Sequence, residues 1–185
     1  MSAVMTTDSF LIVCLAGVLL LAAIYDRRSH RIPNLLTYPT MVVGLAYHGL
    51  TNGLDGFFLS AGGLALGIGI FILPYLMGGM GAGDAKLMGA VGSILGPRGV
   101  FVAFIFSGVV GGIYALILLI INHKYGKEFI IKYGTVLKIF IFTGQFVPIS
   151  ASKKEEVPKL PYGIAIALGT LFYVFLEFSG YEFPV

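Results

Sequence analysis

Asp26 and Asp84 are the acidic residues of this chain whose surroundings suggest chemistry. Asp26 directly follows one apolar run, and Asp84 directly precedes another. The other seven acidic residues lie in polar segments or at the opposite ends of apolar runs: Asp8, Asp55, Glu128, Glu155, Glu156, Glu177 and Glu182. Two neighbouring carboxylates resist double ionisation, so one can take a proton from water while the protonated one polarises a carbonyl. This pairing is the chemistry of an aspartic peptidase.

The residues around Asp84 fit a site that admits an extended substrate. Four glycines precede it at positions 78, 79, 81 and 83, of which Gly81 and Gly83 are the nearest. Glycine allows a tight turn and leaves room for a second backbone. Lys86 either contacts Asp26 or Asp84 electrostatically or extends to the lipid headgroups. A plainer interpretation also stands, in which Asp84 caps a helix and Asp26 pairs with a neighbouring arginine.

The composition points to a membrane protein without a metal centre. Hydrophobic residues make up 57% of the chain and charged residues 11%, whereas soluble domains carry about 25% charged residues. Cys14 is the single cysteine, and the three histidines are scattered, so we expect no disulfide and no metal site. The net charge of +3 is attributed to membrane topology rather than to nucleic-acid binding.

Six apolar segments predict an all-α, polytopic membrane helix bundle formed by a single domain, residues 1–185. A full crossing takes about 20 residues, and several of these segments are shorter. The predicted spans are residues 9–25, 35–50, 56–77, 85–95, 99–121 and 162–178.

The basic residues predict the orientation of these spans. The connections 26–34, 78–86 and 122–161 contain 11 of the 12 basic residues, and the remaining one is Arg98. Positive charge favours the cytoplasmic side, so both termini are expected outside and both aspartates at the cytoplasmic face. Within the long cytoplasmic loop, residues 129–146 are expected to form an amphipathic helix on the membrane surface.

Three stretches of this sequence resemble the type IV prepilin peptidases. Residues 81–87, Gly-Ala-Gly-Asp-Ala-Lys-Leu, are similar to the family's glycine-x-glycine-aspartate motif and its continuation. Asp26 followed by Ile32-Pro33-Asn34 resembles the first catalytic aspartate and its sequel. Residues 160–165, Leu-Pro-Tyr-Gly-Ile-Ala, resemble the entry to the family's last helix. The compact form is similar to the CpaA/TadV-type peptidases of tight-adherence (Flp) pili and to archaeal preflagellin peptidases.

The resemblance implies an intramembrane aspartic endopeptidase that cleaves the basic leader of Flp-type prepilins at the cytoplasmic face of the bacterial inner membrane. Asp26 and Asp84 would be the catalytic pair, with Gly81, Gly83 and Lys86 supporting them. Bifunctional members carry an N-methyltransferase domain between the first helices, and Asp26 to Leu35 leaves no room for it. Neither zinc nor S-adenosylmethionine is therefore expected. The expected partners are a prepilin, anionic lipids and the pilus-assembly machinery.

Two other classes of function remain open from the residues themselves. A small transporter could use Asp26 and Asp84 to carry protons or cations, because acidic residues within a membrane are commonly functional. A structural membrane subunit could use them as helix caps. Replacement by asparagine separates these classes, since it preserves size and capping but removes acid–base chemistry.

Overall fold

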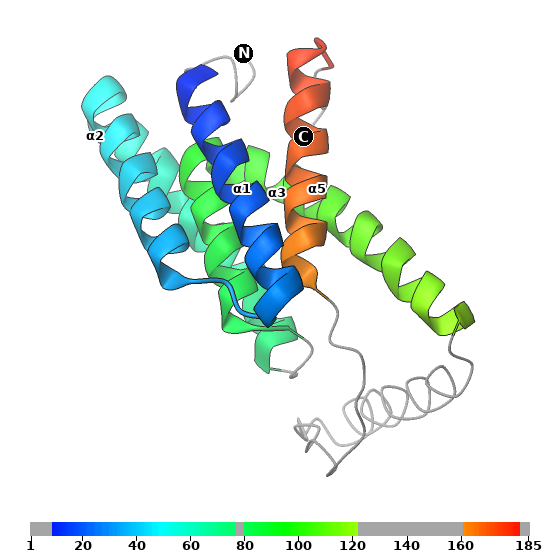
Figure 1. The fold of residues 1–185 in the computed structure, drawn as a ribbon. Coiled ribbons are helices and arrows are strands. Elements are labelled where there is room, and N and C mark those ends of the chain that lie inside the picture. The colour runs from blue at the N-terminus through cyan, green and yellow to red at the C-terminus, as the bar shows by residue number, and fades with distance from the viewer. Residues whose placement is uncertain (1–8, 77–79, 122–160, 182–185) are drawn as a thin grey trace, which may run out of the picture.

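The computed structural model describes residues 9–76, 80–121 and 161–181, and these residues contain four helices and no strand. The helices are α1 (Ser9–Ser29), α2 (Asn34–Leu76), α3 (Ala82–Ile121) and α5 (Tyr162–Phe178) (Figure 1). The all-helical prediction is confirmed for this part of the chain. The predicted amphipathic segment 129–146 lies outside the described residues.

α2 and α3 each reverse direction at a single glycine. Gly53 has φ 63° and ψ −145°, and Gly96 has φ 71° and ψ −178°, a left-handed φ that glycine tolerates best. Figure 1 shows each of these helices rising in its first part and descending in its second part. A Cβ added at Gly56 would meet the carbonyl oxygen of His48, so the two arms of α2 touch next to the reversal.

These reversals replace two of the predicted loops. The apolar segments 35–50 and 56–77 were expected to be separated by five residues, and 85–95 and 99–121 by three. Each pair instead continues through its connection with one non-helical residue. The first predicted span, 9–25, is extended by four residues in α1, whereas the last prediction, 162–178, has the same bounds as α5.

The reversal in α3 is supported by side chains from α2. Pro97 has no N–H to donate to the carbonyl of Ser93, and the hydroxyl of Ser60 donates to that oxygen instead, at 2.6 Å. The carbonyl of Ile94 lies at 2.9 Å from Nε2 of His48, which must carry the proton because a carbonyl can only accept. Ser60 is fully buried and His48 is 2% exposed. His48 therefore has a structural role in holding α2 and α3 together.

Glycines allow α2 and α3 to pack backbone to backbone. A Cβ added at Gly63 would lie 2.7 Å from the carbonyl carbon of Gly96 and would also meet the carbonyl oxygen of Gly92. One added at Gly67 would meet the backbone of Met88. Small residues at such positions are the usual means by which membrane helices approach closely.

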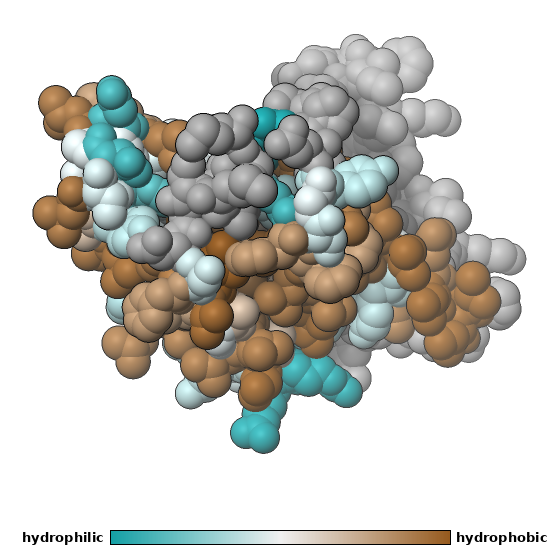
Figure 2. Space-filling model, turned by 90° about the horizontal axis from the view of Figure 1, so that it is seen from above, coloured by the Kyte–Doolittle hydropathy of each residue, from teal (hydrophilic) through white to brown (hydrophobic). Residues whose placement is uncertain are grey.

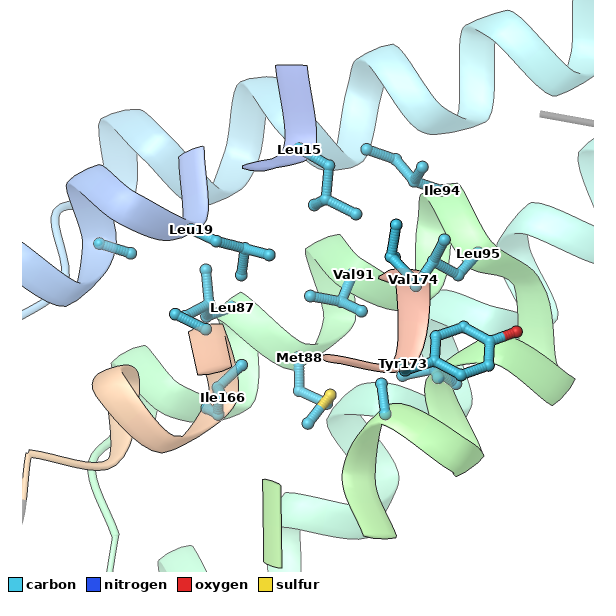
Figure 3. Close-up of a cluster of buried hydrophobic side chains, with 14 of the residues drawn as sticks. Leu15, Leu19, Leu87, Met88, Val91, Ile94, Leu95, Ile166, Tyr173 and Val174 are labelled. Atoms are coloured by element: carbon cyan, nitrogen blue, oxygen red, sulfur yellow. The ribbon is translucent and has the colours of Figure 1, made fainter. Parts of the chain in front are cut away.

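The first half of α3 is the centre of the bundle. Leu87, Met88 and Val91 have no exposed surface, and they pack with side chains of α1 and α5 (Figure 3). Leu15 and Leu19 come from α1, and α5 adds its own apolar face. The first half of α3 therefore packs against α5, which in turn is the main neighbour of α1, and both α1 and α5 matter for the site.

The outer surface of the bundle is apolar. Many large hydrophobic side chains are more than half exposed, among them Phe10, Leu35, Leu50, Ile120 and Phe175. In the view from above, hydrophobic residues make up much of the visible surface, and hydrophilic groups form separate patches among them (Figure 2). By length and composition, three of the described helices could cross a membrane, and Tyr162–Phe178 is a shorter apolar helix. Such a surface is suited to lipid, and the chain is a membrane protein.

Candidate active site

Asp26 lies inside α1 rather than after it. The helix continues past the predicted span to Ser29, with Arg27 and Arg28 in its last turn, where positive charge favours a helix C-terminus. His30 directly follows the helix, has φ 49°, and its N–H still donates to the carbonyl of Asp26 at 2.9 Å. Both arginines are exposed, whereas Asp26 is only 6% exposed. The carboxylate therefore points into the bundle.

The buried partner of Asp26 is the N-terminus of α5. The backbone N–H of Gly163, the second residue of α5, donates to Oδ2 of Asp26 at 2.8 Å. Pro161 occupies the N-cap position of α5 and provides no side-chain hydrogen bond. The first N–H groups of a helix have no partner within it. Asp26 thus acts as the cap of a helix that begins 136 residues later in the chain.

Asp84 is the third residue of α3, not its N-cap. Its Oδ2 accepts the N–H of Gly81 at 3.0 Å, and its own N–H donates to the carbonyl of Gly81 at 3.1 Å. An acidic side chain that reaches back to the N-cap N–H is the acidic half of a capping box. Asp84 is 8% exposed. Asp84 does cap the start of α3, as the plainer interpretation expected. It does so from the third residue of the helix and not from the N-cap position, which Gly81 occupies.

The two carboxylates belong to the same end of the bundle. The C-terminus of α1 and the N-termini of α3 and α5 all lie at the lower end in Figure 1. The charge of Asp26 acts on Asp84, and the charge of His30 acts on Asp26. Two buried carboxylates whose charges act on each other favour a state in which only one is ionised, which is the state that acid–base catalysis by such a pair requires.

Gly83 packs against the connection between α1 and α2. It lies within the first turn of α3, and no left-handed φ is found there. A Cβ at this position would be 3.2 Å from Cβ of Ile32, which is itself 8% exposed. The missing side chain thus allows the connection between α1 and α2 to pack on the start of α3. Gly81 is exposed, and a Cβ there would be 3.3 Å from the carboxylate of Asp84.

Lys86 binds neither aspartate. Its Nζ donates to Oδ1 of Asn34 at 2.9 Å and lies 5.1 Å from the centre of the Tyr38 ring. Asn34 is the first residue of α2 and follows directly on Ile32 and Pro33. The two sequence motifs are therefore joined twice, by Ile32 against Gly83 and by Asn34 to Lys86.

Metal-ligating side chains do not gather in the described part of the chain. No group of three histidine, cysteine or acidic residues there lies close enough to hold a metal ion. The polar groups available at the site are the two carboxylates and the backbone N–H groups that bind them.

Two positions were not recognised from sequence as interacting. Gly163 belonged to a stretch that resembled the family, but nothing in its type showed that its N–H would bind Asp26. Glu177 was expected at a polar helix end, yet it is 7% exposed and interacts with Tyr173 one turn earlier on α5. Glu177 lies near the C-terminus of α5, away from the aspartates.

Comparison with known proteins agrees with the motifs. Residues 13–116 match the type IV leader peptidase family, a stretch that contains both aspartates. A prepilin leader peptidase/N-methyltransferase of Vibrio cholerae serotype O1 is 29% identical over 113 residues, covering 58% of this chain and 45% of that relative. The chain thus spans less than half the length of the relative. No solved structure matches. The match covers more than half of the chain, which therefore belongs to the type IV leader peptidase family.

Proposed function

We propose that this protein is an aspartic endopeptidase that removes the leader peptide of prepilins, with Asp26 and Asp84 as its catalytic pair. The observation that carries the proposal is that two buried carboxylates from different helices lie at one end of the bundle. Both lie within the stretch that matches the leader peptidase family.

The pair would hydrolyse a peptide bond by acid–base catalysis without a covalent intermediate. The ionised carboxylate takes a proton from water as the water oxygen adds to the scissile carbonyl. The protonated carboxyl group gives its proton to the carbonyl oxygen, and the amide nitrogen is protonated as the bond breaks. Positioned acid–base catalysis of this kind contributes about 10²–10⁴-fold to rate.

The charge distribution supports an active site at the cytoplasmic face of a bacterial inner membrane. Among the described residues, Arg27, Arg28, Arg31 and Lys86 lie at the end that carries the aspartates, and Arg98 lies beside the reversal of α3. Positive residues favour the cytoplasmic side of a membrane. We infer six crossings, formed by α1, the two arms of α2, the two arms of α3, and α5. The basic groups would contact anionic lipids.

The substrate we propose is a Flp-type prepilin with a basic leader, delivered to the pilus-assembly machinery after cleavage. Four residues separate the end of α1 at Ser29 from the start of α2 at Asn34. No methyltransferase domain fits between these helices, which supports a peptidase without methylation activity.

The test is a cleavage assay with matched asparagine variants. The wild type, Asp26→Asn and Asp84→Asn are each co-expressed with a Flp-type prepilin, and the size of the prepilin is followed on gels. Asp55→Asn is the control, because Asp55 is exposed and lies beside the reversal of α2 at Gly53.

The expected result is a shortened prepilin with the wild type and Asp55→Asn, and none with either dyad variant at equal membrane levels. Asparagine keeps the size and capping ability of aspartate, so loss of cleavage reports the chemistry. Cleavage by either dyad variant would remove that residue from the mechanism.

A further inference from the structure

Resting on the function proposed above, we propose that Gly163 is a positioning residue and that the N-terminus of α5 holds Asp26 as the ionised general base, leaving the shared proton on Asp84. This assigns different roles to the two carboxylates. It also makes α5, which lies outside the matched stretch 13–116, part of the catalytic machinery.

The first argument is the bond itself. Gly163 N–H donates to Oδ2 of Asp26 at 2.8 Å within a buried environment. A hydrogen bond donated to a carboxylate favours its ionised form, and the N-terminus of a helix carries partial positive charge. Asp26 lies near the C-terminus of α1, which disfavours a negative charge. The N-terminus of α5 compensates for that disadvantage.

The second argument is the shape of residue 163. A Cβ at Gly163 would lie 2.9 Å from Oδ2 of Asp26, 3.0 Å from its Cβ and 3.1 Å from its Cγ. All three distances are shorter than ordinary contacts between carbon and its neighbours. Any larger side chain at residue 163 would force Asp26 to shift, whereas glycine lets the helix backbone approach the carboxylate to hydrogen-bonding distance without that shift. The φ of Gly163 is not left-handed, so close approach is the reason for glycine.

The third argument is the arrangement of charges around the pair. The groups near Asp26 are His30 after α1, Asp84 on α3, and the exposed Arg27 and Arg28 on its own helix. On α5 the nearest titratable residue in sequence is Tyr162. The basic residue closest in sequence to Asp84 is Lys86, which is held by Asn34 and Tyr38. The positive charge found to act on the pair thus comes from His30, which follows Asp26 by one helical turn.

With these roles, each proton in the reaction has a defined place. Asp26 takes a proton from water while the water oxygen bonds to the scissile carbonyl carbon, and Asp84 protonates the carbonyl oxygen. In the second half, the proton on Asp26 passes to the amide nitrogen as the C–N bond breaks. Asp84 recovers a proton from one hydroxyl of the intermediate, which becomes the carboxyl group of the product. Both residues return to their starting states.

The experiment measures kcat and KM against pH for the purified full chain in detergent, with a Flp-type prepilin as substrate. Gly163→Ala is expected to lower kcat by about 10- to 100-fold, because a catalytic group displaced by about 1 Å costs that much. The acid limb of the rate profile should move to higher pH by about one unit, since the ionised form loses a charged hydrogen bond. Gly169→Ala, a change on the same helix α5 that would clash with the backbone of Ser107 on α3, is the control for packing damage alone.

If Gly163→Ala yields no folded protein, a second pair of variants tests whether the N-terminus of α5 keeps Asp26 ionised. Pro161→Ser places a hydroxyl at the N-cap of α5, where it accepts from the N–H groups of the first turn and competes with Asp26. Pro161→Ala is its reference, because it removes the ring without offering an acceptor. The acid limb of Pro161→Ser should lie at higher pH than that of Pro161→Ala.

The possible outcomes separate this inference from the function on which it rests. If Asp26→Asn still cleaves the prepilin in this assay, the proposed function fails. If Asp26→Asn is inactive while folded Gly163→Ala keeps the wild-type kcat and acid limb, the function stands and the inference is wrong. Identical acid limbs for Pro161→Ser and Pro161→Ala would overturn it equally.

Discussion

Removal of the Ser60 hydroxyl should destabilise the protein measurably, because the reversal of α3 leaves a carbonyl group that its own helix cannot satisfy. Pro97 occupies the position whose N–H would bind the carbonyl of Ser93, and Ser60 supplies the missing donor at 2.6 Å. Ser60→Ala deletes one oxygen atom at a fully buried position and changes little else.

The size of the effect follows from the setting of this bond. Hydrogen bonds between membrane helices contribute on average about 0.6 kcal/mol and at most about 1.7 kcal/mol. One kcal/mol corresponds to about 2–4 °C in Tm for a protein of this size. Ser60→Ala should therefore lower Tm by roughly 1–7 °C. Tm is measured on the purified protein in mild detergent as the loss of monodisperse material on heating.

Ser107→Ala is the matched control. Ser107 is also buried and its hydroxyl also donates at 2.6 Å, to the carbonyl of Ala103. That carbonyl has a regular partner, since the N–H of Ser107 is available to it within the same helix. A serine that bonds back to its own helix adds little stability, so Tm should stay within about 1 °C of the wild type. Equal losses in the two variants would refute the idea that the reversal depends on a donor from α2.

Three further predictions concern the contacts that join the motifs and helices. Lys86→Met removes the bond to Asn34 between the two motifs; kcat should fall several-fold with little loss of folded protein, whereas an unchanged kcat would exclude a positioning role. Gly92→Ala forces a Cβ into the backbone of α2, so size-exclusion chromatography should show no folded protein. Gly112→Ala is the control, because its Cβ meets open space and the yield should stay normal. A normal yield of Gly92→Ala would contradict the close packing of α2 and α3. Gly83→Ala pushes against the connection between α1 and α2, and should lower kcat by about 10-fold through misplacement of the dyad, with wild-type rates as the refuting result.

The positions of the helices could largely be predicted from hydrophobic runs, and their ends could not. α5 was predicted with its observed bounds because polar residues or turns flank its apolar run on both sides. α1 extends four residues beyond its apolar run, because Arg27 and Arg28 favour a helix C-terminus although they interrupt hydrophobicity. Hydropathy indicates which residues favour lipid, whereas the length of a helix depends on its backbone hydrogen bonds. The end of a hydrophobic run therefore need not be the end of the helix.

The composition of the site could be predicted in part. Asp26 and Asp84 were chosen as candidates because each acidic residue lies next to an apolar run and within a motif that resembles the family. The hydrogen bond from Gly163 to Asp26 joins residues 137 positions apart. Every residue except proline has a backbone N–H, so the residue type does not indicate which one donates to Asp26. The same applies to Lys86, whose partner Asn34 lies 52 residues away. Pairwise contacts of this length depend on the packing of whole helices.

The separation in sequence between Asp26 and Gly163 also determines when the proposed site can be completed during synthesis. The helices α1 to α3 can be completed before α5 exists, but Asp26 acquires its helix N-terminus only from a residue 137 positions later. At a synthesis rate of about 5–20 residues per second, this interval lasts roughly 7–27 s. On the roles proposed here, a nascent chain has both carboxylates from the synthesis of Asp84 onward, through the later part of this interval, but it lacks the group that ionises Asp26. On this proposal, peptidase activity would begin only after α5 has been synthesised.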